Sequence, residues 1–233
     1  MSGLSELLSI IVPVYNEVAT SRAVIDRLLA IDQPPPREII VVDDGSTDGT
    51  GAVLDAAVLE RPMITVLHAG RNQGKGSAIR LGLARARGSI VAIQDADLEL
   101  DPQELRGLVE PILLGAADVV FGSRFLRGRA DAPLYTFVAN RVLTAVTNAL
   151  FGASITDMET CYKVMRTEVF RSLGLTAERF EIEPEITARL LRRGHRIHEL
   201  PVRFNARSRA QGKKIGWRDG VRALQVLVRE RFG

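Results

Sequence analysis

Cysteine occurs only once among the 233 residues, as Cys161, which excludes an intrachain disulfide. We interpret Cys161 as a small buried apolar residue of a protein in a reducing compartment. No apolar run reaches the roughly 18 residues that a membrane-spanning helix needs. The first residues lack a basic segment and include Pro13, so they predict a strand rather than a signal peptide. We therefore expect neither a disulfide-stapled nor a membrane-spanning protein.

Aromatic residues are also scarce, at 5%, whereas hydrophobic residues make up 46% and charged residues 25%. This composition is typical of a globular protein and excludes a disordered or collagen-like chain. The net charge of +3 is unevenly distributed: from Arg203 onward there are nine basic and two acidic residues, which leaves the preceding part at −4. A basic carboxyl-terminal tail predicts contact with phosphate in a small ligand, a membrane headgroup or nucleic acid.

Apolar β-branched runs and segments of helical periodicity alternate along the chain. Strands are predicted at 8–14, 38–42, 64–67, 90–94, 119–122, 161–165 and 197–204. Helices are predicted at 20–31, 51–60, 75–86, 102–114, 133–151, 184–193 and 216–232. Strands separated by helices of this length predict an α/β fold, with a mostly parallel open sheet flanked by helices. No linker interrupts the chain, so we expect a single domain over residues 1–233.

Polar residues directly follow five of the predicted strands. They occupy residues 13–17, 43–46, 71–76, 95–99 and 122–124. Ligands of an open parallel sheet bind beyond the carboxyl ends of its strands. Each of these segments taken alone also fits an ordinary polar loop, but five of them at one sheet edge predict a binding site.

Asp95 and Asp97 form the most informative pair at this edge. In extended backbone the side chains of residues i and i+2 point the same way. Two carboxylates about 4 Å apart repel each other by about 4 kcal/mol at an effective dielectric constant near 20. A divalent cation relieves this repulsion, and oxygen ligands on an open rim suit Mg²⁺ or Mn²⁺. The alternative is that Asp97 only begins the turn that leads to Pro102.

Asp43 and Asp44 are typical of a nucleoside site, because a carboxylate accepts hydrogen bonds from a base or a ribose hydroxyl. An Asx-type turn with Ser46 as a helix cap is the alternative. Residues 70–76 lack the spacing of a phosphate-binding P-loop, and no G-x-G-x-x-G follows the first strand. The three histidines, His68, His195 and His198, are expected to lie away from this edge, and Cys161 has no evident histidine partner, so we expect no nucleophilic triad.

The segments IIVPVYNE, VVDDGSTDGT, NQGKG, QDADLE and GSR occur in an order and spacing that resembles glycosyltransferase family 2. The segments TDMETCYKV and RSRAQGKKI are similar to the dolichyl-phosphate mannose and glucose synthase branch, especially its bacterial members. The resemblance covers residues 8–222 and implies the GT-A fold. It also implies a nucleotide-sugar half at about 8–124, an acceptor half at about 125–205 and a basic tail and helix at about 206–233.

The resemblance implies roles for individual residues. Asp95 and Asp97 match the D-x-D metal motif, with Glu99 as a third ligand. Arg124 and Arg141 are placed at phosphate. Apart from the resemblance, a hydroxyl acceptor would need a carboxylate base, for which Asp157 or Glu159 is the candidate. A turn hydrogen-bonded to backbone is the alternative interpretation of both acids. The remaining residues are expected at the nucleotide sugar: Pro13, Tyr15, Glu17, Asp43, Asp44 and Lys75, with Arg207, Lys213 and Lys214 closing over the pyrophosphate.

The function implied by the resemblance is a metal-dependent, inverting transfer of mannose or glucose from a GDP- or UDP-sugar to a polyprenyl phosphate. Such an acceptor is already an anion, so it needs cations but no general base. A saccharide hydroxyl as acceptor is the alternative, and that reaction does need a carboxylate base. A third reading is a phosphate- or nucleic-acid-binding module without catalysis, which the few aromatic residues of the tail disfavour.

A lipid acceptor implies contact with a membrane. Helices 133–151 and 216–232 are the candidates for lying on its surface, at the cytoplasmic face. The alternative is that helix 133–151 is a core or homodimer contact and that helix 216–232 presents a solvated basic face. We expect no nucleic-acid partner.

Overall fold

The computed structural model describes residues 6–32, 35–59, 61–128, 133–207 and 217–233. Within these ranges the strands form one seven-stranded sheet, in the order β3-β2-β1-β4-β6-β5-β7. The strands are β1 (Leu8–Val14), β2 (Arg37–Asp43), β3 (Ile64–His68), β4 (Ile90–Ile93), β5 (Val119–Ser123), β6 (Lys163–Arg166) and β7 (His198–Pro201). Only β6 runs antiparallel to its neighbours, β4 and β5, so the sheet is mostly parallel, as the sequence predicted.

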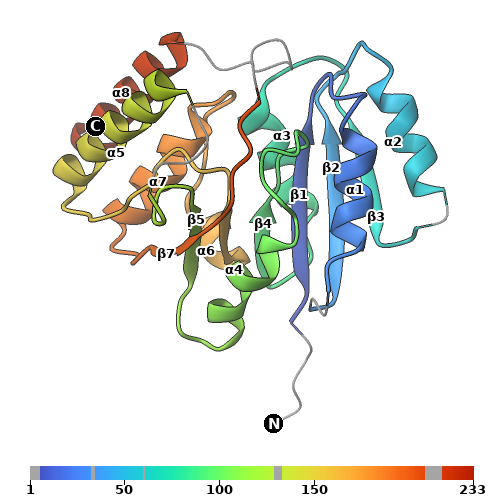
Figure 1. Cartoon of the computed structure of the whole chain (residues 1–233), viewed down its shortest axis with the longest axis horizontal. Helices are drawn as coiled ribbons and strands as arrows, with labels where there is room; N and C mark the ends of the chain where they lie inside the picture. The colour runs from blue at the N-terminus through green and yellow to red at the C-terminus, as the bar shows by residue number, and fades with distance from the viewer. Residues whose placement is uncertain (1–5, 33–34, 60, 129–132, 208–216) are drawn as a thin grey trace.

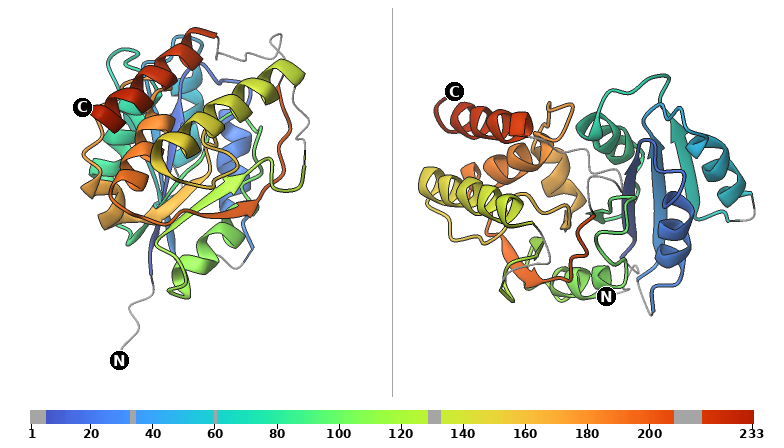
Figure 2. Two further views of the ribbon diagram at one scale, coloured as in Figure 1. Left: turned by 90° about the vertical axis from the view of Figure 1, so that its left-hand side faces the viewer. Right: turned by 45° about the horizontal axis from the view of Figure 1, so that its top comes forward.

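Helices flank this sheet (Figure 1). They are α1 (Ser21–Leu29), α2 (Thr50–Val58), α3 (Lys75–Arg85), α4 (Glu104–Leu113), α5 (Leu134–Phe151), α6 (Thr167–Ser172), α7 (Ile182–Arg192) and α8 (Trp217–Phe232). α3 contacts β1 and β2, whereas α4 contacts the other half of the sheet. α5 and α8 contact each other and lie side by side in both views of Figure 2.

The central strands are buried because their sequences are almost entirely β-branched or apolar. β2, for example, reads REIIVVD, and its residues Ile39, Ile40, Val41 and Val42 are fully buried. A strand that is apolar on both faces is stable only where helices cover both faces. A second, smaller core joins α5, α7 and α8 through residues that include Leu143, Met158 and Leu227. These two cores hold the two halves of the chain around one sheet.

The second half departs more from the predicted elements than the first. The predicted strand 197–204 is shorter, as β7, and the helix α6 was not predicted. β6 begins two residues later than expected and runs antiparallel because residues 152–162 remain at the carboxyl edge of β5 before the chain enters the sheet. Among the helices in the described ranges, none combines the length and the apolar content that a bilayer-spanning segment requires.

Candidate functional site

The carboxyl ends of the parallel strands meet at one edge of the sheet. Val14 of β1 lies opposite Asp43 of β2, and Asp43 lies opposite His68 of β3. β4 pairs with β1 on its other side, and this brings Asp95 and Asp97 to the same edge. We call this rim of residues 13–17, 43–46, 71–75 and 95–99 the carboxyl edge. The strand register confirms the predicted convergence for these four segments. The fifth predicted segment, 122–124, lies at the end of β5, which runs in the same direction as β4 and so ends at the same edge.

Hydrogen bonds join the loop after β1 to the loop after β2. The backbone N–H of Asn16 donates to Ser46 Oγ at 2.9 Å, and the N–H of Glu17 donates to Thr50 Oγ1 at 3.0 Å. Asn16 has a φ of +50°, a left-handed conformation that asparagine tolerates better than most residues. Pro13 in β1 and Tyr15 just beyond it are half-buried. This turn places Tyr15 and Glu17 at the rim, beside the acids of β2.

Asp43 and Asp44 are both buried, but they have different partners. Asp43 accepts a hydrogen bond from the Ser46 N–H at 2.9 Å, and its other oxygen lies 3.0 Å from His68 Nδ1. Asp44 accepts from the N–H groups of Gln73 and Gly74, at 2.9 and 2.6 Å. Burial raises the pKa of Asp44, although both amide hydrogen bonds oppose the shift. Asp44 thus fixes the loop that leads into α3.

The position of His68 corrects the expectation that all three histidines lie away from this edge. β3 extends one residue further than predicted, and its last residue is His68. The ring bridges Asp43 and Asp55, with 3.0 Å from Nε2 to Asp55 Oδ1. The hydrogen bond to Asp43 is the main reason why the pKa of His68 is raised. His198, in contrast, is exposed, and His195 is half-buried beyond α7.

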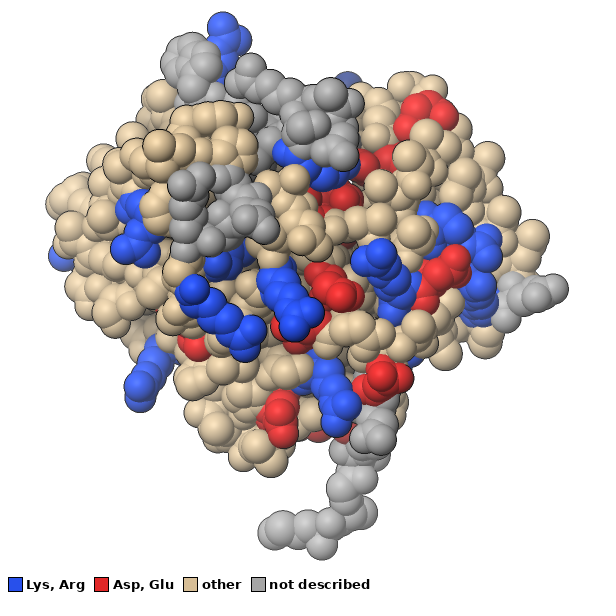
Figure 3. Space-filling view, viewed as in Figure 1, with Lys and Arg blue, Asp and Glu red and all other residues tan. Residues whose placement is uncertain are grey.

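The pair Asp95 and Asp97 lies between two cations. Lys75 Nζ is 2.7 Å from Asp95 Oδ1, and Arg207 Nη2 is 3.0 Å from Asp97 Oδ2. Arg207 also contacts Glu17 at 3.0 Å, and its backbone N–H donates to Glu99 Oε1 at 2.7 Å. Burial, followed by repulsion from Asp95 and Glu99, raises the pKa of Asp97 to about 7. Figure 3 shows that basic and acidic side chains also lie next to one another across the middle of the face seen in Figure 1.

Burial contributes most to the raised pKa of Asp97, and the nearby charges of Asp95 and Glu99 add a repulsion that a divalent cation would relieve. Within the described ranges no group of three acids, histidines or cysteines is spaced to enclose a metal ion. Mg²⁺ and Mn²⁺ do not need such a group, since they commonly take one or two carboxylates together with phosphate oxygens of a ligand. Asp95 and Asp97 therefore fit a metal that is shared with a diphosphate.

Arg124 and Asp157 form a buried ion pair beyond β5. The guanidinium donates through Nε and Nη2 to the two carboxylate oxygens, each at 2.7 Å, and the Arg124 N–H adds a third bond at 3.0 Å. The guanidinium carbon lies 5.2 and 5.1 Å from the ring centres of Phe125 and Phe204. The structure thus brings the two predicted site residues Arg124 and Asp157 together, and they form an ion pair with each other.

Glu159, the other candidate base, has a different environment. Burial, followed by repulsion from Glu183, raises its pKa to about 7. Its Oε1 is buried and has no hydrogen-bond partner among the described residues. Arg141 is exposed on α5, and its Nη1 reaches the Thr156 carbonyl only at 3.4 Å. Lys213 and Lys214 lie outside the described residues.

Sequence reasoning missed Glu183, which joins the site through Lys75. Glu183 Oε1 lies 2.9 Å from Lys75 Nζ, a close ion pair that is not aligned as a hydrogen bond. Glu183 is buried at the start of α7 and also contacts the fully buried Lys163. A signal was present, since Glu183 stands next to Ile182 on the apolar stripe that continues with Ile186 and Leu190. An acid beside such a stripe predicts a buried charge with a partner.

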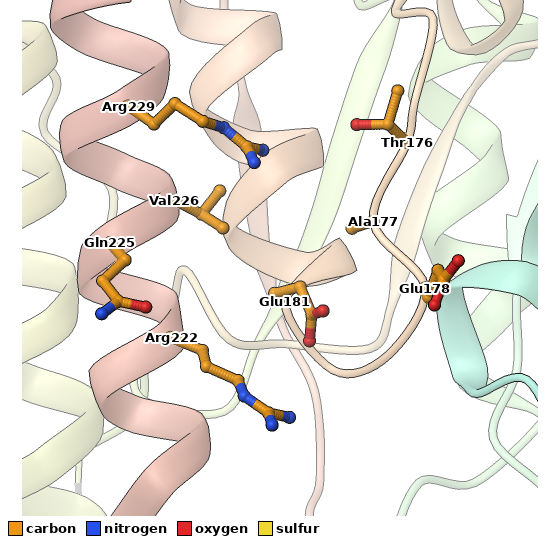
Figure 4. A pocket seen from close by; sticks show the side chains of 8 residues that line it. All are labelled: Thr176, Ala177, Glu178, Glu181, Arg222, Gln225, Val226 and Arg229. Carbon is orange, nitrogen blue, oxygen red and sulfur yellow. The ribbon is translucent and has the colours of Figure 1, made fainter.

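A separate hollow of about 420 Å³ lies between α8 and the segment before α7 (Figure 4). Its lining comprises Thr176, Ala177, Glu178, Glu181, Arg222, Gln225, Val226 and Arg229. Two arginines of α8 face two glutamates across it, so the lining favours neither an anion nor a cation.

The chain is similar to known proteins over most of its length. The family model described as glycosyl transferase family 2 matches residues 9–174. An undecaprenyl-phosphate mannosyltransferase from Micrococcus luteus is 31% identical over 228 residues, which cover 93% of this chain and 90% of that protein. A polyprenol monophosphomannose synthase from Mycolicibacterium smegmatis is 30% identical over 230 residues, covering 95% and 85%.

Among solved structures, glucosyl-3-phosphoglycerate synthase from Mycobacterium tuberculosis in complex with Mn²⁺ and UDP-glucose matches with a TM-score of 0.75. The identity is 22%, and the match covers 97% of this chain and 79% of that one. At this identity the likeness concerns the fold, and it confirms the expected GT-A fold. With a family model that covers most of its length and relatives that match it nearly end to end, this chain belongs to glycosyl transferase family 2.

Proposed function

We propose that this protein transfers mannose or glucose from a GDP- or UDP-sugar to a polyprenyl phosphate, with the help of Mg²⁺ or Mn²⁺. The observation that carries the proposal is the pair Asp95 and Asp97, held at the carboxyl edge between Lys75 and Arg207. The names of the two relatives support the lipid phosphate as the acceptor class.

On the donor side, we assign Pro13, Tyr15, Glu17 and Asp43 to the base and ribose. They lie at the carboxyl ends of β1 and β2 or just beyond, next to the carboxylates that follow β4. When bound to Asp95 and Asp97, a divalent ion would stabilise the negative charge that develops on the leaving diphosphate. Arg207 already bridges Glu17 and Asp97, so its guanidinium is within reach of the same diphosphate.

The reaction requires one displacement at the anomeric carbon. An oxygen of the acceptor phosphate forms a bond to this carbon while the bond to the donor diphosphate breaks, and the nucleoside diphosphate leaves with the electron pair. Attack from the opposite side inverts the anomeric configuration. The acceptor is anionic near neutral pH, so no proton has to be removed. Asp157 fits this scheme as the anchor of Arg124 rather than as a base, because both of its oxygens accept from that guanidinium.

We further propose that α5 and α8 face the membrane that contains the acceptor. Leu134, Tyr135, Val138 and Val142 are exposed along one side of α5, and Arg141 flanks them. Val221, Val228 and Phe232 form a similar exposed stripe on the neighbouring α8. Apolar stripes bordered by basic residues are typical of helices that lie in the headgroup region. Sedimentation with anionic liposomes tests this: wild type should bind, and Val138→Glu with Val142→Glu should not.

A transfer assay tests the proposed function. Purified protein is incubated with Mn²⁺ or Mg²⁺ and with radiolabelled GDP-mannose or UDP-glucose, and either a short polyprenyl phosphate or a saccharide is offered as acceptor. We expect label in a polyprenyl phosphate hexose with one donor and loss of transfer on chelation of the metal. Label that appears only on saccharides would instead support the hydroxyl acceptor, with Glu159 as the candidate base.

A further inference from the structure

Four charged side chains of alternating sign run from the core to the carboxyl edge. Lys163 is fully buried and contacts Glu183, Glu183 lies 2.9 Å from Lys75, and Lys75 lies 2.7 Å from Asp95. The exposed fraction of the side chain rises along this series, from 0% at Lys163 to 12% at Lys75 and 27% at Asp95. The series therefore has a fixed inner end and an outer end that a ligand can reach.

The backbone around Lys75 is tightly fixed. Lys75 is the first residue of α3 and follows Gly74, which has a φ of +100°. A Cβ atom on Gly74 would overlap the carbonyl oxygen of Glu178, and one on Gly76 would overlap that of Ala177. Only glycine permits such a close approach of two backbone segments. Because of this contact, the ammonium of Lys75 cannot move far by a shift of the backbone, and its reach depends on side-chain rotation.

Lys75 has two carboxylate partners: Asp95, which is partly exposed and can be exchanged, and Glu183, which is fixed in the core. Its ammonium donates a hydrogen bond to Asp95 Oδ2 at 2.9 Å, whereas its contact with Glu183 is an ion pair without hydrogen-bond alignment. Glu183 in turn is held by Lys163 inside the core. If Asp95 turned to another cation, Lys75 would still face a carboxylate. An unpaired charge at this depth would be costly, and Glu183 prevents it.

We propose that Lys75 is an internal counterion that competes with the divalent metal for Asp95, and that Glu183 positions it for this exchange. In the nucleotide-free protein the ammonium neutralises Asp95, so free metal binds weakly. A metal that arrives with a diphosphate brings negative oxygens to which Lys75 can turn while it keeps Glu183. The charge series therefore favours binding of the metal together with the nucleotide over binding of the metal alone. The inference rests on the proposed metal site.

Mn²⁺ binding without nucleotide, measured by electron paramagnetic resonance of the free ion, tests this proposal. Lys75→Met should bind Mn²⁺ about tenfold more tightly than wild type, since a competing cation is gone. Lys75→Arg retains the charge and should behave like wild type. Arg85→Met, which removes an exposed cation from the far end of α3, should change the affinity less than about twofold.

The variant Glu183→Gln should change the Mn²⁺ affinity in the opposite direction. Without its anchor, Lys75 has only Asp95 as a carboxylate partner, so Mn²⁺ should bind about threefold more weakly than to wild type. General damage to the fold would weaken binding in both Lys75→Met and Glu183→Gln. A melting temperature that Mn²⁺ raises more in Lys75→Met than in wild type would support the proposal even for a destabilised variant.

Two results would overturn the inference, and they differ from each other. Equal Mn²⁺ affinity of wild type and Lys75→Met, together with uptake in the presence of GDP or UDP, would refute the competition but leave the metal site in place. No Mn²⁺ uptake by any variant, even with GDP or UDP, would refute the proposed metal site as well.

Discussion

The first half of the chain (residues 8–124) and the second half (residues 125–205) each contain a pair of buried carboxylates, and the two pairs are held by different means. Asp43 and Asp44, at the end of β2, accept hydrogen bonds from backbone N–H groups of nearby loops. In the second half, Asp157 and Glu183 are held mainly by charged side chains from distant positions. When a carboxylate held by backbone amides is replaced, the N–H groups that remain carry no net charge. When a carboxylate held by a charged side chain is replaced, that charge is left buried and alone.

Asp95 and Asp97 stand at the boundary between these two arrangements. Each faces a cation, as Asp157 and Glu183 do, but each is partly open to solvent, with 27% and 17% of the side chain exposed. Carboxylates that are paired and still accessible can exchange partners, which a ligand site requires. Exposure to solvent thus separates the carboxylates that fix the fold from those that are available for chemistry.

The largest expected effect is on catalysis, from Asp97→Asn. The amide cannot supply the negative oxygen that a metal needs, so transfer should fall by about two to three orders of magnitude. The melting temperature should stay level or rise slightly, because the substitution removes a buried charge together with its repulsion by Asp95 and Glu99. Glu110→Gln, an exposed acid on α4, serves as the control and should leave both unchanged. A large loss of stability in Asp97→Asn would show that this carboxylate is structural.

The second prediction concerns stability and compares the two halves directly. Asp157→Asn leaves the guanidinium of Arg124 buried without an anion, and the free energy of unfolding should fall by about 3 kcal/mol. Asp44→Asn removes a carboxylate whose partners are amides, and the loss should be about 1–2 kcal/mol. Urea unfolding followed by circular dichroism measures both. Equal losses would remove the distinction between the two halves.

A third prediction uses two acids of raised pKa, one from each half. Burial brings both Asp97 and Glu159 to a pKa of about 7 in the folded protein, far above the roughly 4 of the unfolded chain. Between these values the folded state keeps protons that the unfolded state has released. The free energy of unfolding of the metal-free protein should therefore decrease as the pH rises from about 4 to about 7. Asp97→Asn and Glu159→Gln should each make the slope of melting temperature against pH shallower, and an unchanged slope would contradict the assignment for that residue.

The first half of the fold could be predicted from the sequence because its information is local. Apolar runs such as that of β2 form the sheet, and the acids that follow them arrive at one edge through the geometry of parallel strands. The pairing of Arg124 with Asp157 joins residues 33 positions apart, and no periodicity encodes it. The same holds for Lys163 and Glu183, whose side chains meet only because β6 runs antiparallel and brings its first residue towards α7.

The smallest expected effect comes from His68, whose position the sequence did not predict because β3 was expected to end one residue earlier. Its ring is 43% exposed and holds one oxygen of Asp43, whose other oxygen accepts from the Ser46 N–H. His68→Asn should therefore loosen Asp43 only partly and raise the KM for the nucleotide sugar about two- to fivefold, with kcat unchanged. The control is Asp55→Asn, which removes the exposed partner of the same ring and should have less effect. A fall in kcat instead of a rise in KM would mean that His68 acts on the reacting atoms, and the first half would then contain a catalytic group that is held by a charged partner.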